Sequence, residues 1–314
     1  MSRQVVFGTG QVGSHVITQL LAADHDVTAV SRSGSRQFQN ADNVGGDATD
    51  PAFATAVCAG ADVVYFCLDA PDYHRWPEQF PPLQAGVLAG ATSAGARLVV
   101  LENLYGYGPA GGTTLTETLP MAATSAKART RVGMTTQLLA AHRAGVVDVA
   151  IGRASDYFGP GATHSALGDL VFANALRAKT AQVMGDADQP HSYSYTPDVA
   201  AGLIALGTAA GATGEVWHLP IAETWTTRRV IEHVYRLAGT RPRVFAAGRT
   251  GLRLYGVVRP EMREYLHTLY QFTDPWVVDD TKFRSAFGDL STPLPDALAT
   301  TLDSYRTNPA KDMT

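Results

Sequence analysis

The sequence predicts an α/β fold in which a doubly wound parallel sheet is followed by a smaller C-terminal lobe. Three observations support this prediction. Short apolar strands alternate with longer segments of helical periodicity over residues 1–160. The strands are continuously apolar, as a sheet covered on both faces requires. After residue 160 the alternation loosens, so we assign residues 161–314 to a lobe from which the chain crosses back to the first domain.

The composition is that of a globular protein and excludes several classes. The chain has 314 residues, of which 45% are hydrophobic and 17% charged, and its net charge is −4. It contains no basic run, which argues against a nucleic-acid partner. Cys58 and Cys67 lie in apolar surroundings and are interpreted as buried small hydrophobes in a reducing compartment. No His/Cys/Asp/Glu grouping has metal-site spacing, so no metal is expected.

The first strand runs directly into a glycine-rich turn. Residues 5–7 are an apolar strand, the turn reads Gly8-x-Gly10-x-x-Gly13, and residues 14–21 repeat apolar side chains at helical spacing. This order is the dinucleotide-binding fingerprint. Gly8 allows the tight turn, Gly10 lets the backbone approach a pyrophosphate, and Gly13 lets the helix pack closely on the strand. Two turn residues are expected to contact the cofactor as well: Gln11 and Val12.

The second strand, His25–Val30, ends in a basic loop. An NAD-preferring fold usually places an acid about 20 residues after the glycines, yet this chain has none between Asp26 and Asp42. Hydroxyl and guanidinium groups suit a 2′-phosphate, which favours NADP while leaving NAD open. The alternative is a solvated loop that happens to be basic. The residues expected to bind the phosphate are Ser31, Arg32, Ser33 and Arg36.

The next strands lead into two candidate contacts. Asp47 ends a short strand at 43–47, where it meets an adenine edge or caps the turn before Asp50-Pro51. Residues 62–68 form a buried strand, and Leu68 at its end is expected to touch the cofactor. An aromatic loop follows at the carboxyl end of that strand, where ligands bind in open α/β sheets. Its substrate-pocket candidates are Tyr73, His74 and Trp76, with a surface role as the alternative for His74.

The rest of the chain is predicted as alternating elements. A helix spans 78–95, a strand 96–101, a long helix 125–142 and a strand 146–151. The loop after that last strand includes Ala154, expected at the cofactor. Helical segments are then expected at 165–178, 197–209, 226–238, 249–270 and 292–306, with short strands near Gln182, Glu215 and Arg243.

Together these motifs resemble the extended short-chain dehydrogenase/reductase superfamily, in its NAD-dependent epimerase/dehydratase group. The resemblance covers nearly the whole chain, and it implies a Rossmann-type domain and hydride transfer. It also implies a Tyr-x-x-x-Lys pair, in which the lysine binds the nicotinamide ribose and lowers the tyrosine pKa. The supporting motifs are the glycine turn, Tyr107-Gly108-Pro109, Thr116-Glu117-x-x-Pro120, Lys127, Arg153 to Pro160, and Tyr195-x-x-Asp198-Val199-Ala200.

The chain departs from this family at three positions. Lys127 is present, but Ala123 stands where the tyrosine is expected. Asn103 replaces the serine or threonine after the fifth strand, and Phe7 replaces the first glycine. These departures make the chain resemble the atypical members of the superfamily, which lack parts of the usual active site. An enzyme without the positioned acid would lose about 10²- to 10⁴-fold in rate unless another group stood in.

Tyr105 is the candidate replacement, because it lies at the strand exit where Lys127 would lower its pKa. Tyr107 and Tyr157 are the next candidates. For Tyr105 and Tyr107 the alternative is a ring packed under the loop. Asn103 is expected to donate to a substrate carbonyl or to hold a water.

Two further residues, Asp156 and His191, are expected on the substrate side. The alternatives for Asp156 are a bridge to Arg153 or a cap on the turn at Gly159-Pro160. His164 and His218 are assigned structural roles, because the sequence gives them no visible partner.

The favoured function is an NADP-dependent oxidoreductase that reduces a carbonyl or an activated double bond of a small apolar substrate. The alternatives are a nucleotide-sugar epimerase or dehydratase that uses NAD, and a non-catalytic NADP-binding sensor or scaffold. No apolar run reaches the ~18 residues of a membrane span, and the first strand begins too early for a signal peptide. We therefore expect a cytoplasmic protein with no membrane partner. The resemblance also implies a homodimer formed through the helices flanking Lys127.

Overall fold

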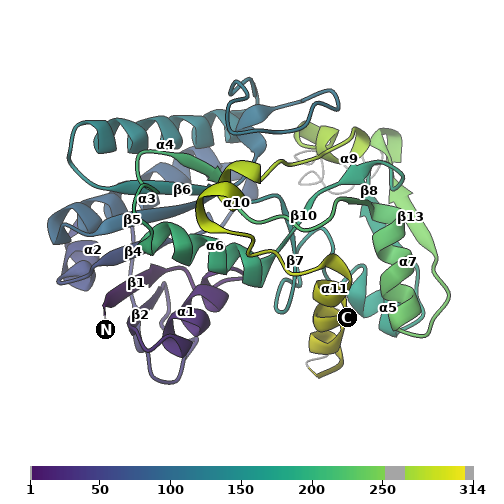
Figure 1. Cartoon of the computed structure of the whole chain (residues 1–314), viewed down its shortest axis with the longest axis horizontal. Helices are drawn as coiled ribbons and strands as arrows, with labels where there is room; N and C mark the ends of the chain where they lie inside the picture. Colours follow the sequence, from purple (N-terminus) through teal and green to yellow (C-terminus); the bar gives the residue numbers. More distant parts are fainter. Residues whose placement is uncertain (1, 252–265, 308–314) are drawn as a thin grey trace.

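The computed structural model describes residues 2–251 and 266–307. Its centre is a seven-stranded sheet in the order β11-β6-β5-β4-β1-β2-β3, and every pairing in it is parallel. This confirms the predicted doubly wound fold (Figure 1). The strands are β1 (Arg3–Phe7), β2 (Asp26–Ser31), β3 (Asp42–Gly45), β4 (Val63–Phe66), β5 (Arg97–Glu102), β6 (Val149–Arg153) and β11 (Val216–His218).

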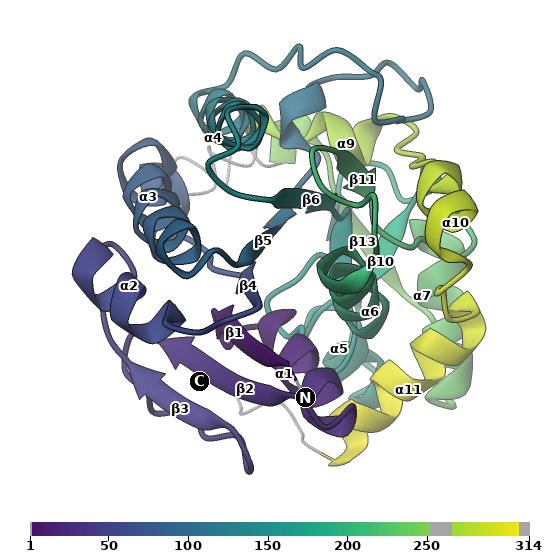
Figure 2. The same ribbon diagram turned by 60° about the vertical axis from the view of Figure 1, so that its left-hand side comes forward.

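Helices cover both faces of the sheet (Figure 2). On one face lie α1 (Gly13–Ala22) and α6 (Thr196–Thr208), and on the other lie α2 (Pro51–Cys58), α3 (Trp76–Ala94) and α4 (Ala126–Arg143). Neighbouring strand residues point to opposite faces, so Val6 packs under α1 and α6 whereas Val5 packs under α3 and α4. Both are fully buried, which explains why the strands are continuously apolar.

A smaller lobe lies beside the sheet and has its own core. This core includes Phe172, Val230, Tyr235 and Leu298. The lobe contains α5 (Phe172–Leu176), α7 (Thr227–Leu237), α9 (Tyr270–Thr273) and α11 (Leu294–Thr307), with β8 (Ala181–Met184) paired to β13 (Val244–Ala247). Helix α10 (Thr281–Phe287) packs instead against β11 of the sheet, and its Phe283 belongs to the core below α6. Between the sheet and the lobe, β7 (Asp156–Phe158) pairs with β10 (Tyr193–Tyr195), while β9 (Pro190–His191) pairs with β12 (Trp225–Thr226). Two short 3₁₀ turns complete the described elements, η1 (Tyr73–Arg75) and η2 (Tyr105–Tyr107).

The chain returns to the sheet domain after entering the lobe. Immediately after β10, α6 packs against α1, and β11 then adds to the sheet by pairing with β6. The division at residue 160 stays a prediction, but the crossing back to the sheet is observed.

Several predicted boundaries need correction. The helix expected at 165–178 is the short α5, because residues 162–171 form turns that bond to one another. The sequence reasoning did not assign α2, which begins after Asp50 accepts a hydrogen bond from the Ala52 N–H. The helix expected at 249–270 falls largely on residues 252–265, which lie outside the described residues.

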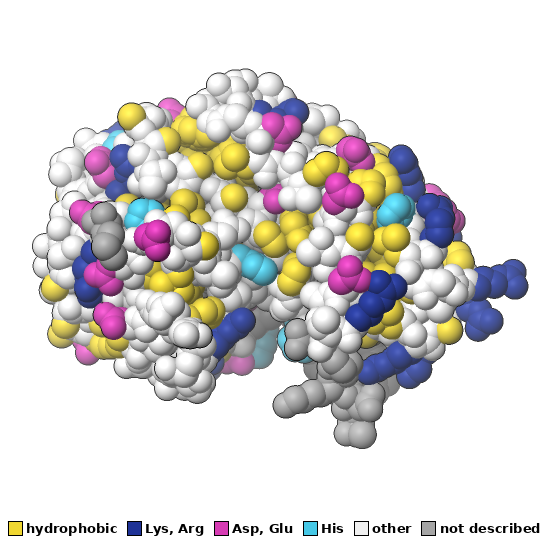
Figure 3. Space-filling view, turned by 60° about the horizontal axis from the view of Figure 1, so that its bottom comes forward, with side chains coloured by type: hydrophobic (Ala, Val, Ile, Leu, Met, Phe, Trp, Pro, Cys, Tyr) yellow, Lys and Arg dark blue, Asp and Glu magenta, His cyan; other side chains and the backbone are white. Residues whose placement is uncertain are grey.

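Three features of the described residues bear on the expected partners and on the state of the cysteines. None of the described helices combines the length and apolar character of a membrane span. On the face shown in Figure 3, Lys and Arg side chains are interspersed with Asp and Glu. Cys58 is buried and Cys67 is half-buried, and both are free thiols.

Candidate dinucleotide and substrate site

The glycine turn has the geometry that the sequence predicts. Gly8 has φ +107°, a conformation that side chains rarely adopt, and a Cβ at Gly13 would lie 1.9 Å from the Gly8 carbonyl oxygen. A Cβ on Gly10, by contrast, would meet nothing within 4 Å. Gly10 therefore faces open space at the start of α1, whose first turn has no capping side chain and no acid. These features fit a bound pyrophosphate.

A cleft of about 390 Å³ opens beside this turn at the carboxyl ends of β1, β2 and β4. Four predicted cofactor contacts line it: Ser31, Arg32, Asp47 and Leu68. The side chain of Asp47 accepts hydrogen bonds from the backbone N–H and the hydroxyl of Thr49, which lower the pKa of this carboxyl. The capping alternative for Asp47 is thus observed, and the residue also faces the cleft.

Other predicted cofactor residues lie elsewhere. Arg36 donates to the Thr9 carbonyl oxygen at 2.6 Å, so its guanidinium braces the glycine turn. Ser33 bonds to the Ser35 hydroxyl and does not line the cleft. The Val12 side chain packs in the core, which leaves only its backbone for a ligand. Ala154 is buried, and its N–H donates to the Glu102 carbonyl oxygen.

A second cavity of about 480 Å³ lies at the beginning of α4. Lys127 lines it and is 4% exposed, and Ser125 caps the helix by accepting from the Ala128 N–H. Ala123 lines the same cavity in the loop before the helix. His74 and His267 complete its basic lining, and none of the described lining residues is acidic. The side chain of Tyr73 lies outside the described part of the chain.

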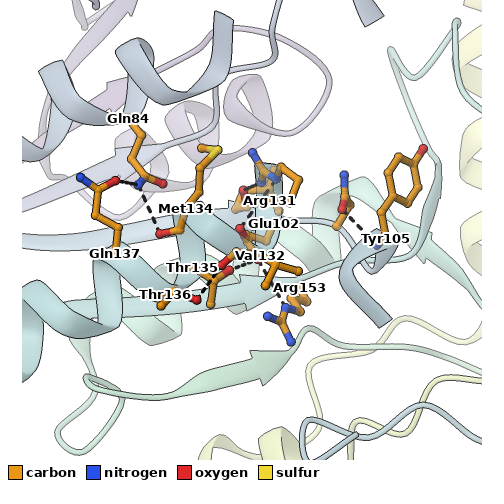
Figure 4. Close-up of polar contacts among 12 residues, drawn as sticks. Gln84, Glu102, Tyr105, Arg131, Val132, Met134, Thr135, Thr136, Gln137 and Arg153 are labelled. Carbon is orange, nitrogen blue, oxygen red and sulfur yellow. Dashed lines mark hydrogen bonds and ion pairs between the residues drawn. The ribbon is translucent and has the colours of Figure 1, made fainter. Parts of the chain in front are cut away.

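Behind α4, a charged cluster is buried at the end of β5 (Figure 4). The Glu102 carboxylate accepts from the Thr135 hydroxyl at 2.7 Å and from Arg153 Nε at 3.4 Å. Arg131 Nε lies 3.7 Å from the other carboxylate oxygen. Two guanidinium groups thus share one carboxylate, and each of the three side chains is at most 5% exposed.

The Tyr107 side chain is buried beside this cluster. The prediction that it lines the substrate pocket is therefore corrected. Its hydroxyl lies 2.7 Å from His218 Nε2 and accepts from Arg153 Nη1 at 2.9 Å. Burial raises the pKa of Tyr107 and lowers the pKa of His218. His218 is structural, as predicted, but it has partners: Nδ1 also lies 2.9 Å from the Asp279 carbonyl oxygen.

Trp76, another predicted pocket residue, belongs to the core. It is 5% exposed and packs edge-on against Phe80 with ring centroids 4.9 Å apart. Tyr105 is half-buried and stacks on the Trp76 ring at 5.7 Å. The Asn103 side-chain Oδ1 accepts from the Tyr105 N–H at 3.1 Å, so this side chain shapes the turn. In Figure 4 the Tyr105 ring points away from the Glu102 cluster.

Asp156 and His191, both expected on the substrate side, lie together. His191 Nε2 is 3.0 Å from Asp156 Oδ2. The alternative bridge from Asp156 to Arg153 is absent among the described contacts, because Arg153 bonds to Glu102 and Tyr107. Tyr157 is half-buried in the core cluster below α6, and burial raises its pKa.

Sequence reasoning missed Arg131, Thr135 and His267. The signal for Arg131 was its position four residues after Lys127, which places both side chains on one face of a helix. Both are buried in the structure, so a polar pair at helical spacing marked the inner face of α4. Among the described residues no cluster suits a metal ion.

Comparisons with known proteins agree with this geometry. The family model of the NAD dependent epimerase/dehydratase family matches residues 5–219. The dTDP-glucose 4,6-dehydratase DesIV from Streptomyces venezuelae, solved with NAD, is 23% identical; the match covers 98% of this chain and 97% of that chain, with a TM-score of 0.79. The UDP-glucose 4-epimerase of Thermotoga maritima, solved with UDP-glucose, is 17% identical; that match covers 98% and 99% of the two chains, with a TM-score of 0.77. No curated protein matches the sequence significantly.

Proposed function

The chain belongs to the NAD dependent epimerase/dehydratase family, and from this premise we propose that it binds a nicotinamide dinucleotide and acts on a nucleotide sugar. The observation that carries the proposal is the glycine turn, which follows Phe7, a residue that lines the cleft at the carboxyl edge of the sheet. Gly10 and the first turn of α1 would hold the pyrophosphate, and Lys127 would bind the nicotinamide ribose. The dinucleotide would supply or accept a hydride when bound.

The cofactor proposed is NADP, with NAD as the alternative. Arg32 and Ser31 line the cleft, and residues 27–41 contain no acid that would bind a ribose hydroxyl. A guanidinium matches phosphate geometry, and a charge-assisted hydrogen bond contributes about 1.5–3 kcal/mol. The solved relatives contain NAD. Arg32→Ala is therefore expected to weaken binding of NADP⁺ about tenfold and to leave binding of NAD⁺ unchanged.

The second cavity favours an anionic substrate over an apolar one. Lys127, His74 and His267 line it, together with the first residues of the 18-residue helix α4, whose N-terminus favours negative charge. UDP-glucose and dTDP-glucose each carry a negatively charged diphosphate, which would suit this lining. The basic lining therefore supports the nucleotide-sugar function over reduction of a small apolar carbonyl compound.

Binding and turnover test the proposal in sequence. Purified protein is titrated with NADP⁺ and NAD⁺ by calorimetry, with Gly10→Trp as the variant that fills the open side of the turn. We expect binding in the wild type and none in the variant. UDP-glucose or dTDP-glucose is then added with the bound dinucleotide, and reduced nicotinamide is followed by fluorescence and the sugar by NMR. The proposal fails if neither dinucleotide binds, or if Gly10→Trp binds normally.

A non-catalytic dinucleotide sensor is the second candidate, and one observation favours it. Ala123 lines the cavity where the resemblance places a proton-donating tyrosine. Under this reading the protein binds NADP⁺ yet changes no sugar nucleotide. A panel of ketones with NADPH, run in the same assay, tests the remaining oxidoreductase reading.

A further inference from the structure

We propose that His191 and Asp156 form a proton-loaded pair that delivers its proton to the substrate through Asp156. This inference rests on the proposed function, because it names the residues that would supply the proton in that site. Its basis is the hydrogen-bond inventory of the His191 ring and the position of Asp156 at the carboxyl edge of the sheet.

Both nitrogens of His191 face oxygen acceptors. Nδ1 lies 3.0 Å from the Gln271 carbonyl oxygen, and a carbonyl only accepts, so Nδ1 carries a hydrogen. Nε2 lies 3.0 Å from Asp156 Oδ2. A neutral imidazole already protonated at Nδ1 has a lone pair at Nε2, and a carboxylate has only lone pairs to set against it. The contact therefore needs a further proton, held on Nε2 or on Oδ2.

His218 provides an internal contrast. Its Nδ1 also faces a carbonyl oxygen, that of Asp279, at 2.9 Å. Its Nε2, however, faces the Tyr107 hydroxyl at 2.7 Å, which has a hydrogen to donate. A neutral imidazole satisfies every contact of His218, whereas the contacts of His191 require one proton more.

The pair is packed tightly around His191 and is accessible mainly at Asp156. His191 is 2% exposed, and the rings of Tyr193 and Phe272 lie against it with centroids 4.3 Å and 5.0 Å away. The Asp156 side chain is 19% exposed, so a ligand or solvent reaches the pair through this residue. Oδ1 makes no hydrogen bond within the described part of the chain.

Asp156 lies at the carboxyl edge of the sheet, where ligands bind in open α/β folds. It follows Arg153, the last residue of β6, and begins β7 between the sheet and the lobe (Figure 1). The titratable side chains that face it are His191, Tyr157 and Tyr193. Because every strand of the sheet is parallel, the residues that follow β6 lie at the same edge as the carboxyl ends of β1, β2 and β4, where the cofactor cleft opens.

Ala123 and the neighbouring tyrosines Tyr107 and Tyr157 are less suited to give a proton. Ala123 has none, and the Tyr107 hydroxyl is already shared between His218 and Arg153. Burial raises the pKa of Tyr157 and so holds its proton. Tyr105 is the competing donor, and the test below includes it.

In the reducing direction the bound dinucleotide would supply a hydride that forms a C–H bond at the substrate carbonyl carbon, and the C=O π pair would move to oxygen. That oxygen takes the proton of the pair from Asp156. The pair is left as neutral His191 with Nδ1–H and an Asp156 carboxylate, and solvent returns a proton through Asp156. In the oxidising direction the carboxylate takes the alcohol proton.

The test counts protons on the His191 ring by ¹⁵N NMR near neutral pH, with Asp156→Asn as the diagnostic variant. An asparagine amide donates to Nε2, so it keeps the contact without the extra proton. We expect wild-type His191 to show the pair's proton as a second hydrogen-bonded resonance beside Nδ1–H, and the variant to lose it. Asp188→Asn is the matched control, because it removes a carboxylate from an exposed ion pair with Arg228 in the same lobe.

The turnover found with UDP-glucose or dTDP-glucose provides the second readout. Asp156→Asn is expected to lower kcat by about 10²- to 10⁴-fold and to flatten the pH profile, with dinucleotide affinity unchanged. A single proton at the pair in the wild type overturns the proposal, as does a wild-type kcat in Asp156→Asn combined with a loss in Tyr105→Phe. Failure of the unmutated protein to bind a dinucleotide counts against the proposed function and leaves the NMR result to decide the pair.

Discussion

Replacing Glu102 with glutamine removes the carboxylate between two buried guanidinium groups. In the wild type, Arg131, Arg153 and Glu102 sum to one buried positive charge. In Glu102→Gln the same volume holds two positive charges, and the glutamine amide group would direct hydrogens toward one of the guanidiniums. The Thr135 hydroxyl can still donate to the amide oxygen of the glutamine. The variant therefore separates the effect of the lost negative charge from the effect of a lost hydrogen bond.

The geometry sets the expected magnitude. At 3.4 Å and 3.7 Å, with an effective dielectric constant of about 20, each ion pair is worth roughly 5 kcal/mol before the cost of burying the carboxylate. That cost cancels much of the sum, and breaking a buried ion pair typically destabilises a protein by about 3–5 kcal/mol. We expect a loss in that range, which is a large part of the ~5–15 kcal/mol that keeps a domain folded.

Urea unfolding measured by tryptophan fluorescence and circular dichroism gives the change. Glu215→Gln is the matched control, because Glu215 forms an exposed ion pair with Lys282 and should cost at most about 1 kcal/mol. The reasoning is refuted if Glu102→Gln loses no more than the control. A lowered midpoint with an unchanged slope would assign the effect to native-state stability.

Three other predictions follow from buried groups. Tyr107→Phe leaves Arg153 Nη1 and His218 Nε2 without their shared hydroxyl, so urea unfolding should show a loss of about 1–3 kcal/mol for each group; an unchanged midpoint contradicts the network. Because burial lowers the pKa of His218, the unfolded chain takes up its proton first, so stability falls as pH drops below about 6.5. Thermal melts should show a shallower fall in His218→Gln. Burial raises the pKa of Cys58 and Cys67 to about 12, so a thiol reagent should label both in urea and neither in the folded protein at neutral pH.

The sequence predicted the parts of the fold that depend on local pattern. The glycine turn, the apolar strands and the long helix after Ser125 all follow from spacing within one segment. Ser31 and Arg32 were placed at the end of β2 for the same reason, and both line the cleft; their contact with a cofactor stays a prediction. Helix α5 was predicted too long, since its preceding residues form tertiary turns that no local periodicity marks.

The substrate side was predicted less well, because its residues meet across long sequence separations. Tyr107 reaches His218 over 111 residues and so lies outside the predicted pocket. Trp76 also lies outside it, although its partner Phe80 is nearby on the same helix, because α3 directs the indole into the core. The pairing of Asp156 with His191 depends on the register of β7 with β10 and on the position of the Gln271 carbonyl. The sequence predicted both residues on the substrate side without pairing them; their contact, from which we infer the extra proton, is visible only in three dimensions.

The return of the chain through α6 and β11 has a consequence for how such a protein diversifies. The lobe is interrupted in the sequence by two elements of the sheet domain, since α6 covers buried strand residues such as Val6 and Val99, and β11 pairs with β6. Exchanging the whole segment that contains the lobe would therefore also remove α6, which covers one face of the sheet. A change of substrate preference that keeps this arrangement would fall in the short strands between the sheet and the lobe, where Asp156 and His191 lie.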